Sequence, residues 1–315
     1  MGTLAGLATT YDLPNYGGEL ILVTPTDTPF LSAIGGLSVD DADLVVAATE
    51  FTWQTEDLAA AQQPANLEGA APTIEERTRA SFANVVQIFQ YGVEVSYSKL
   101  AARQQLANLG NGSSNPVQDE LDHQIELKLK TAARDVNFSF INGAYQKPAN
   151  NLSARKTRGL LAAIATNVTA AGGAALTEAM VLDMIQGVYD ARGVHQELMP
   201  VLLTNSTQKR RLSKIFITDK GYAEKTRQVG GVNLQVIETD FGPVGIMLER
   251  AMPASALAFA HIRLCKPKFL VIPNKGFLFV EPLAKTGSSE KYQLYGEVGL
   301  EYGDEVCHAK ITGLA

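Results

Sequence analysis

The side chains that most often carry catalysis or metal binding are few in this sequence and far apart. The histidines are His123, His195, His261 and His308, and the cysteines are Cys265 and Cys307. Cys307 and His308 are neighbours, but adjacent strand residues point to opposite faces of a sheet, so this pair cannot act as nucleophile and base. The two cysteines also lack the spaced Cys and His partners of a zinc site and form no disulfide framework. These residues predict no catalytic or metal centre.

Short motifs of known reactions are absent as well. The sequence contains no GxSxG, GxxxxGKS/T, HExxH or GxGxxG pattern, and AKTGSSEK lacks the leading glycine and the GK order of a phosphate loop. Asp40, Asp41 and Asp43 lack the glycine and the distal glutamate of a calcium loop, which favours a solvated turn. We therefore predict a non-enzymatic protein without cofactor or metal. The alternative is a soluble α/β enzyme whose site has no recognised motif.

The densest group of cations is a basic cluster, which comprises Lys209, Arg210, Arg211 and Lys214. On a helix these positions fall on more than one face, which favours a solvated or subunit-interface cluster. An oligomeric nucleic-acid-binding module that uses Lys209 to Lys214 is the second alternative, and it would show salt-dependent DNA affinity that is lost when Arg210 and Arg211 are replaced. No aromatic residues for base stacking are interleaved with the cluster.

Composition indicates a folded protein with an uneven distribution of charge. The length of 315 residues suits one large domain or two modest ones, and 46% of the residues are hydrophobic. No apolar run approaches the length of a membrane span. The net charge is −6, yet residues 1–76 hold 12 acidic residues and no Lys or Arg, so the remainder carries +6. This separation suits either a solvated acidic arm or a segment that lies on the basic surface of an identical neighbour.

The elements of the first hundred residues form an arm and a hairpin. Residues 1–43 predict an extended arm with one apolar anchor, TPFLSAIGGL at 28–37, and residues 44–53 and 81–96 predict two strands. The polar connection over 54–80 is far longer than the 2–5 residues usual for a hairpin. We therefore predict a projecting hairpin, whose apolar residues are buried by another subunit. Those residues are Leu58, Leu67 and Ile74.

A long helix dominates the middle of the chain. Asn115 as the cap and Pro116 in the first turn mark its start, and Gly143 marks its end. Apolar residues recur within it every three or four positions, and its roughly 27 residues would span about 40 Å. A shorter helix over 99–109, capped by Ser98, is expected before it.

The second half alternates helices and strands. A helix from the cap Thr177 to Gly193 precedes the strand PVLLT and a helix that begins after Asn205 or Ser206. Short strands follow over 232–261, and the chain ends in longer alternating segments, FLFVEPL, YQLYGEVGLEY and VCHAKITGL. The predicted fold class is α+β.

The order of these parts resembles that of a tailed-bacteriophage major capsid protein. It is carried by TPFLSAIGGL, by a hairpin that opens FTWQTEDLAAAQQPANLEG and returns ANVVQIFQYGVEVS, by the helix QDELDHQIELKLKTAARDVNFSFINGA, and by the ending EPLAKTGSSEKYQLYGEVGLEYGDEVCHAKITGL. The resemblance implies the Hong Kong 97 phage fold, also called the Johnson fold. It would comprise an N-terminal arm at 1–43, an extended loop hairpin at 44–98, a peripheral domain at 99–170 and 262–315 with the spine helix 116–142 and the C-terminal strands, and an axial domain at 171–261.

The function that this resemblance implies is structural. Subunits would self-assemble as hexamers and pentamers into an icosahedral shell around double-stranded DNA, in a virion capsid assembled in the bacterial host cytoplasm. The implied partners are the chain itself, packaged DNA by non-specific proximity, and portal, scaffolding and decoration proteins, with no membrane. The residues expected at contacts between subunits are Phe30, Leu31, Trp53, Glu56, Asp57, Leu58, Glu68, Arg77 and Arg79.

One departure limits the resemblance. Some relatives join a lysine of the extended loop covalently to an asparagine of a neighbour. Residues 51–98 contain no lysine, so we expect no such cross-link through this loop. Shell strength would then come from noncovalent contacts or from added proteins.

Overall fold

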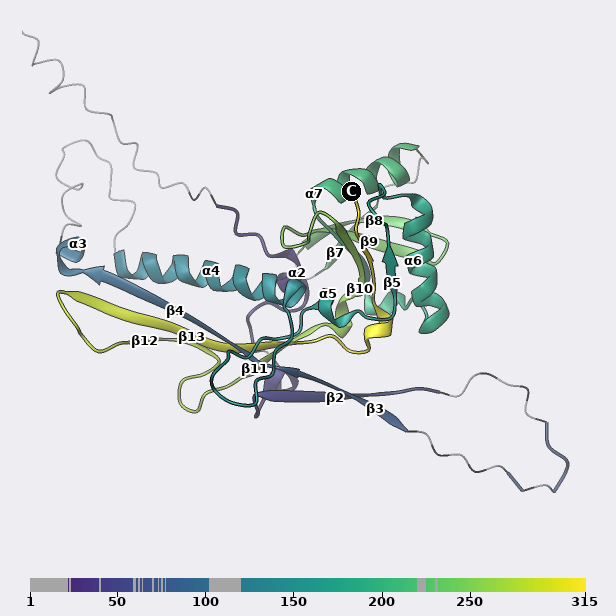
Figure 1. Ribbon diagram of the computed structural model, residues 1–315, viewed down its shortest axis with the longest axis horizontal. Coiled ribbons are helices and arrows are strands. Elements are labelled where there is room, and N and C mark those ends of the chain that lie inside the picture. The colour runs from purple at the N-terminus through teal and green to yellow at the C-terminus, as the bar shows by residue number, and fades with distance from the viewer. Residues whose placement is uncertain are drawn as a thin grey trace, which may run out of the picture. The chain divides into compact units, whose positions relative to one another are not determined.

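The structure is a computed structural model of mixed α+β architecture, as the sequence predicts (Figure 1). It describes residues 22, 24–39, 41–58, 61, 63, 65–69, 71–72, 74, 76, 78–101, 120–219, 225–229 and 232–315. The chain divides into two compact units. The smaller consists of Met1–Thr26, Tyr91–Thr131 and Val280–Leu294, and the larger of Asp27–Gln90, Ala132–Phe279 and Tyr295–Ala315.

The predicted hairpin is present in the larger unit, with tighter bounds. Strand β2 (Glu50–Glu56) pairs antiparallel with β3 (Arg79–Val85), from Glu50 opposite Val85 to Glu56 opposite Arg79. The predicted strand 44–53 is divided, because β1 (Val45–Val46) pairs with β11 (Lys266–Leu270) in another sheet. The return strand is also divided at residue 86, where β4 (Gln87–Ser96) begins to pair with β13. Only 50–85 forms the hairpin.

A five-stranded sheet collects β1, β4 and the later strands. Its order is β1-β11-β13-β12, with β4 also paired to β13; β12 is Leu278–Pro282 and β13 is Ser289–Glu301. The hairpin packs on this sheet at Gly299 of β13. A β-carbon there would lie 2.6 Å from the Phe51 ring and 3.0 Å from the Val85 carbonyl oxygen, so only glycine leaves room for the base of the hairpin.

The long helix α4 is confirmed over its described part, Glu120–Asn142, while its predicted start at 115–119 lies outside the described residues. Of the predicted helix 99–109, the structure describes α3 (Tyr97–Ala101). Gly143 ends α4 as predicted, but the reason is a close approach of two backbone segments. A β-carbon on Gly143 would lie 2.3 Å from the Ser139 carbonyl oxygen and 2.6 Å from that of Thr157. The Gly159 N–H donates to the Gly143 carbonyl oxygen at 2.9 Å.

A seven-stranded sheet in the larger unit has the order β5-β14-β10-β6-β9-β8-β7. Its strands are β5 (Val168–Ala170), β6 (Pro200–Thr204), β7 (Lys225–Val229), β8 (Val232–Thr239), β9 (Gly242–Leu248), β10 (Ala256–His261) and β14 (Ala309–Thr312). Helix α6 (Glu178–Ala191) packs on it through buried residues such as Val181 and Ile185. Helix α7 (Ser206–Leu212) follows β6 and continues as the π-helical turn η4 (Ser213–Asp219). The predicted caps Thr177 and Asn205 each accept a backbone N–H.

The last strand corrects one part of the predicted domain division. Residues 262–315 were expected in the peripheral domain, but β14 pairs antiparallel with β10 and parallel with β5 in the seven-stranded sheet. The cause is burial, because Ala309 and Ile311 are fully enclosed in the same core as Leu257 and Phe259. The other boundaries of the four-part division stay a prediction.

Short helices complete the described chain. They are α2 (Pro29–Ala33), η1 (Ala42–Leu44), α5 (Leu160–Ala163), η3 (Gln196–Leu198), η5 (Ile262–Leu264) and η6 (Glu305–Cys307). Within the described ranges, no helix has both the length and the apolar character to cross a membrane.

Candidate functional site

The apolar anchor of the arm is buried in its own chain, which corrects the prediction that it contacts another subunit. Phe30 is 0% and Leu31 is 2% exposed. The Phe30 N–H donates to Glu249 Oε2 at 3.0 Å, and the Leu31 N–H donates to Asn137 Oδ1 at 2.9 Å. Two side chains enclosed in this way have no surface left to offer a neighbour, so Phe30 and Leu31 are core residues.

Glu249 holds this anchor in place. Its carboxylate is fully buried and accepts three hydrogen bonds, from the Phe30 N–H, from Asn137 Nδ2 at 2.9 Å and from the Ala251 N–H at 3.0 Å. A buried carboxylate is tolerated when hydrogen bonds replace its hydration. Glu249 directly follows β9, and no local pattern of the sequence indicates that it binds a segment more than 200 residues earlier.

Trp53 is also engaged inside the chain. Its indole Nε1 donates to the Gly303 carbonyl oxygen at 2.7 Å. The ring meets Tyr302 edge to face, with the centroids 4.9 Å apart, and stacks on Phe82 across the hairpin at 6.2 Å. These contacts fix the base of the hairpin to the segment after β13. Trp53 is half-buried, and its contact with another subunit stays a prediction.

The Asn-x-x-Gln-Ile pattern of the return strand has a structural role. Asn84 is fully buried, and its Nδ2 donates to the carbonyl oxygens of Arg158 and Leu300, while its Oδ1 accepts from the N–H groups of Val85 and Arg158. Gln87 Oε1 accepts from the Thr157 N–H at 3.3 Å. Both residues therefore join the hairpin base to the chain that follows α4.

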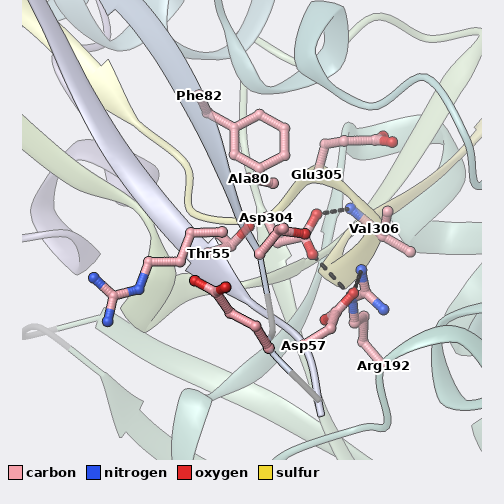
Figure 2. A pocket seen from close by; sticks show the side chains of 11 residues that line it. Thr55, Asp57, Ala80, Phe82, Arg192, Asp304, Glu305 and Val306 are labelled. Carbon is pink, nitrogen blue, oxygen red and sulfur yellow. Dashed lines mark hydrogen bonds and ion pairs between the residues drawn. The ribbon is translucent and has the colours of Figure 1, made fainter. Parts of the chain in front are cut away.

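A cleft of about 440 Å³ lies beside the hairpin where β2 ends and β3 begins (Figure 2). Arg192, at the end of α6, lies between two carboxylates, with its Nη2 3.0 Å from Asp57 and its Nε 2.9 Å from Asp304. The hydrogen bond to Asp304 raises the pKa of Arg192 above its ordinary value. The predicted contact residues Glu56 and Arg79 pair with each other at 3.3 Å across the hairpin.

This cleft positions the hairpin and has no reacting group. Its lining holds the carboxylates of Asp57, Glu76, Asp304 and Glu305, with the guanidinium groups of Arg79 and Arg192. Glu305 is itself occupied, because it accepts from the N–H groups of Ala165 and Thr166 and from the Thr166 hydroxyl. The arrangement is a network of ion pairs that tethers β2 to α6.

The connection between β2 and β3 presents apolar side chains to solvent. Leu58 is 95%, Leu67 is 86% and Ile74 is 94% exposed. Glu68 is exposed between them, and Arg77 lies outside the described residues. Large apolar side chains grouped on one surface loop are typical of interaction sites. Of the contact residues predicted from the sequence, Leu58 and Glu68 are exposed, whereas Glu56, Asp57 and Arg79 are exposed but paired within the chain.

The basic cluster divides between two surroundings. Arg210, Arg211 and Lys214 line a shallow cleft of about 420 Å³ with Ser206 and Thr207. Arg211 Nη1 donates to the Ala315 carbonyl oxygen at 2.6 Å. Lys209 lies apart from that cleft and hydrogen-bonds to Gln235 of β8. The predicted spread over more than one helix face is confirmed.

Three histidines that are far apart in the sequence meet in the structure. The ring centroid of His261 lies 6.3 Å from that of His195 and 6.4 Å from that of His308. His261 and His308 are fully buried, and burial lowers the pKa of both, that of His308 to about 4. Each ring nitrogen of this buried pair has a backbone partner, so both rings are held neutral as part of the core.

The carboxylates of the acidic turn near residue 41 are engaged by contacts within the chain. Asp41 caps η1 by accepting from the Asp43 N–H at 3.1 Å, and Asp43 pairs with Lys266 at 2.9 Å. The hydrogen bond from Lys266 lowers the pKa of Asp43. Asp40 lies outside the described residues. Asp41 thus caps the turn and Asp43 joins it to β11. Among the described residues no group of three or more His, Cys, Asp or Glu side chains gathers around a possible metal.

The described part of the subunit thus has a long helix, two sheets, a hairpin with an exposed apolar connection and no assembled reacting groups, which is the architecture of a phage capsid subunit. Solved structures show the same fold. The capsid asymmetric unit of cyanophage A-1(L) has 14% identity and a TM-score of 0.70, with 97% of this chain and 98% of that chain covered. The capsid of a native GTA particle has 15% identity and a TM-score of 0.62, with 100% and 99% covered. The structure from Mycobacterium phage Cain has 13% identity and a TM-score of 0.61, with 99% and 97% covered.

The family follows from the sequence itself. The model of the SU10 major capsid protein family matches residues 3–315, and the chain belongs to that family. No curated protein matches it. The chain is a major capsid protein of tailed phages, a structural component of the virion and not an enzyme, and it associates with copies of itself into a capsid shell.

Proposed function

We propose that the chain assembles as hexamers and pentamers into an icosahedral shell that encloses double-stranded DNA, and that the hairpin connection makes contacts between neighbouring subunits. The hairpin connection is the segment 57–78 between β2 and β3. The observation that carries this proposal is the exposure of Leu58, Leu67 and Ile74 on that segment. Burying an aliphatic side chain of this size contributes about 1.5–3 kcal/mol, so three of them on each subunit favour association strongly.

Removal of the hairpin connection tests this role. In the variant, a short Gly-containing turn replaces residues 57–78 and joins Glu56 directly to Arg79, because these two residues already pair at the end of the hairpin. We expect the variant to fold, since its two sheets and α4 are unchanged, but to remain unassembled. Sedimentation velocity and electron microscopy of the purified chain report assembly, and circular dichroism reports the fold. Shells formed by the shortened chain would show that the intersubunit contact lies elsewhere.

The DNA inside the shell is proposed as a neighbour held without sequence-specific contacts. Arg210 and Arg211 provide the matching test, because the alternative of a nucleic-acid-binding module requires them. We expect the double replacement R210A/R211A to leave DNA affinity and its salt dependence almost unchanged. A loss of steep salt-dependent binding in this variant would favour the alternative. Portal, scaffolding and decoration proteins remain partners that the resemblance implies.

A further inference from the structure

We propose that Arg192 is an ion-pair latch that holds the outer half of the hairpin at one angle to the body of the subunit, and that the outer half swings away from the body when this latch opens. The outer half is defined here as residues 54–57 and 78–81, and the body as the larger unit without the hairpin and its connection. The inference concerns a single subunit and goes beyond the contacts between subunits proposed above.

The base of the hairpin is held firmly, but its outer half is not. Trp53 Nε1 donates to the Gly303 carbonyl oxygen at 2.7 Å, and the buried Asn84 side chain donates to two carbonyl oxygens of the body. Asp57 lies four positions beyond Trp53, which is about 13 Å further along a strand. Among the described residues, the ion pair of Asp57 with Arg192 is the one polar contact that joins the outer half to the body.

The cleft beside the hairpin gives the outer half room to move. It has a volume of about 440 Å³, and the hairpin residues Thr55, Ala80 and Phe82 line it together with Asp304 and Val306 of the body (Figure 2). A two-stranded hairpin by itself is only marginally stable in water, so its angle depends on what it contacts. Over the cleft, the polar contact that sets this angle is the latch.

The two ion pairs of Arg192 differ in how well they are sheltered from solvent. The Asp304 side chain is 12% exposed, and its Oδ1 accepts from the Val306 N–H at 3.1 Å. The Asp57 side chain is 64% exposed. An exposed ion pair contributes little and is screened by salt, whereas a sheltered pair is screened much less. Arg192 therefore stays with Asp304, and the contact with Asp57 opens first.

The charges around the cleft make the position of the outer half depend on Arg192. The cleft lining holds four carboxylates, two on each side; they are Asp57 and Glu76 of the hairpin and its connection, with Asp304 and Glu305 of the body. The other cation of the lining, Arg79, is paired with Glu56 within the hairpin. Without the guanidinium of Arg192, carboxylates of equal charge face each other across the cleft and repel. Loss of Arg192 therefore drives the outer half away from the body.

An adjustable hairpin has a consequence for assembly, and this consequence rests on the proposed function. Hexamers and pentamers place the same chain in different surroundings, so a hairpin fixed at one angle cannot suit both equally. A weak latch lets contacts with neighbours select the angle that each ring requires, while the base of the hairpin stays in place.

Distances between two spin labels on the unassembled full chain test this inference. Q54C places one label on the hairpin and Q186C places the other on α6; both positions are exposed and lie outside the cleft lining. The native thiols react little at neutral pH, because burial raises the pKa of Cys265 to about 12 and that of Cys307 to about 11. Double electron–electron resonance then reports the distance between the labels.

The expected result depends on salt and on the latch residues. At low salt we expect one narrow distance distribution in the labelled chain, and a longer and broader one after R192A or D57N. At about 1 M salt the screening length falls to about 3 Å, so the distribution of the labelled chain should shift toward that of R192A. R192A itself should not lengthen further, because it has no latch left to screen.

The matched control is K147Q. Lys147 pairs with Glu50 at 2.5 Å and also joins the hairpin to the body through an exposed ion pair, but it does so at the base. We expect K147Q to keep the distance distribution of the labelled chain. Equal lengthening in K147Q and R192A would overturn the inference, since it would indicate a general loosening of the hairpin.

Unchanged distributions in R192A and D57N would overturn the inference as well. Circular dichroism checks the fold, and if R192A does not fold, D57N decides, because Asp57 lies at the surface and its replacement removes the same contact. These measurements use the unassembled chain. A failed latch therefore leaves the intersubunit role of the hairpin connection standing, and a chain that forms no shell leaves the latch standing.

Discussion

Acidification should destabilise the subunit through His308. Its Nδ1 accepts from the His261 N–H at 3.3 Å and its Nε2 donates to the Tyr302 carbonyl oxygen at 2.7 Å, so a proton on Nδ1 breaks a hydrogen bond inside the core. Burial is the main cause that lowers its pKa from 6.5 to about 4. The facing His261 lowers this pKa further, whereas Asp304 and Glu305 raise it.

The size and direction of the effect follow from the two pKa values. Below pH 6.5 the unfolded chain binds a proton at this histidine and the folded chain does not, so the free energy of unfolding falls as the pH falls. The loss is about 1.4 kcal/mol for each pH unit and reaches about 3 kcal/mol by pH 4. His261 adds to the loss in the same direction, because burial lowers its pKa too.

Urea denaturation of the unassembled chain at several pH values between about 4.5 and 7.5 measures this dependence. We expect H308Q to be less stable than the wild type at neutral pH and to lose less stability on acidification. The control is I311V on β14, a fully buried residue without a titrating group, which should lower stability by about 1 kcal/mol at every pH. A slope in H308Q equal to that of the wild type would refute the assignment to His308.

Two further predictions concern the framework of the subunit. E249A should lower the free energy of unfolding by at least about 3 kcal/mol, because three N–H donors, two of them buried, lose their acceptor. E249Q should cost less in the same urea titration, and equal losses in both variants would contradict this account. G143A should lower the melting temperature far more than G187A on α6, where a β-carbon meets nothing within 4 Å. Similar melting temperatures would show that the chain after α4 yields to a methyl group.

Local signals of the sequence determined much of the fold. The side-chain oxygens of Thr177 and Asn205 cap their helices because this chemistry depends only on residues two or three positions away. The strand PVLLT is fully buried as its apolar run indicates. The polar connection 54–80 predicted an extended hairpin for a similar reason, because so long a segment with scattered leucines has no local core to join. The order of these parts was enough to indicate the capsid family.

The tertiary structure decided what those elements contact. Phe30 belongs to the core because Glu249, more than 200 positions away, accepts its N–H, and no periodicity in either segment encodes that pairing. His261 and His308 meet because β10 and β14 are neighbours in one sheet, which the sequence placed in separate domains. Gly143 is required by the carbonyl oxygens of Ser139 and of Thr157, 14 positions later, and not by a left-handed turn. Periodicity fixes which face of an element is apolar, whereas the partner of that face depends on how the whole chain packs.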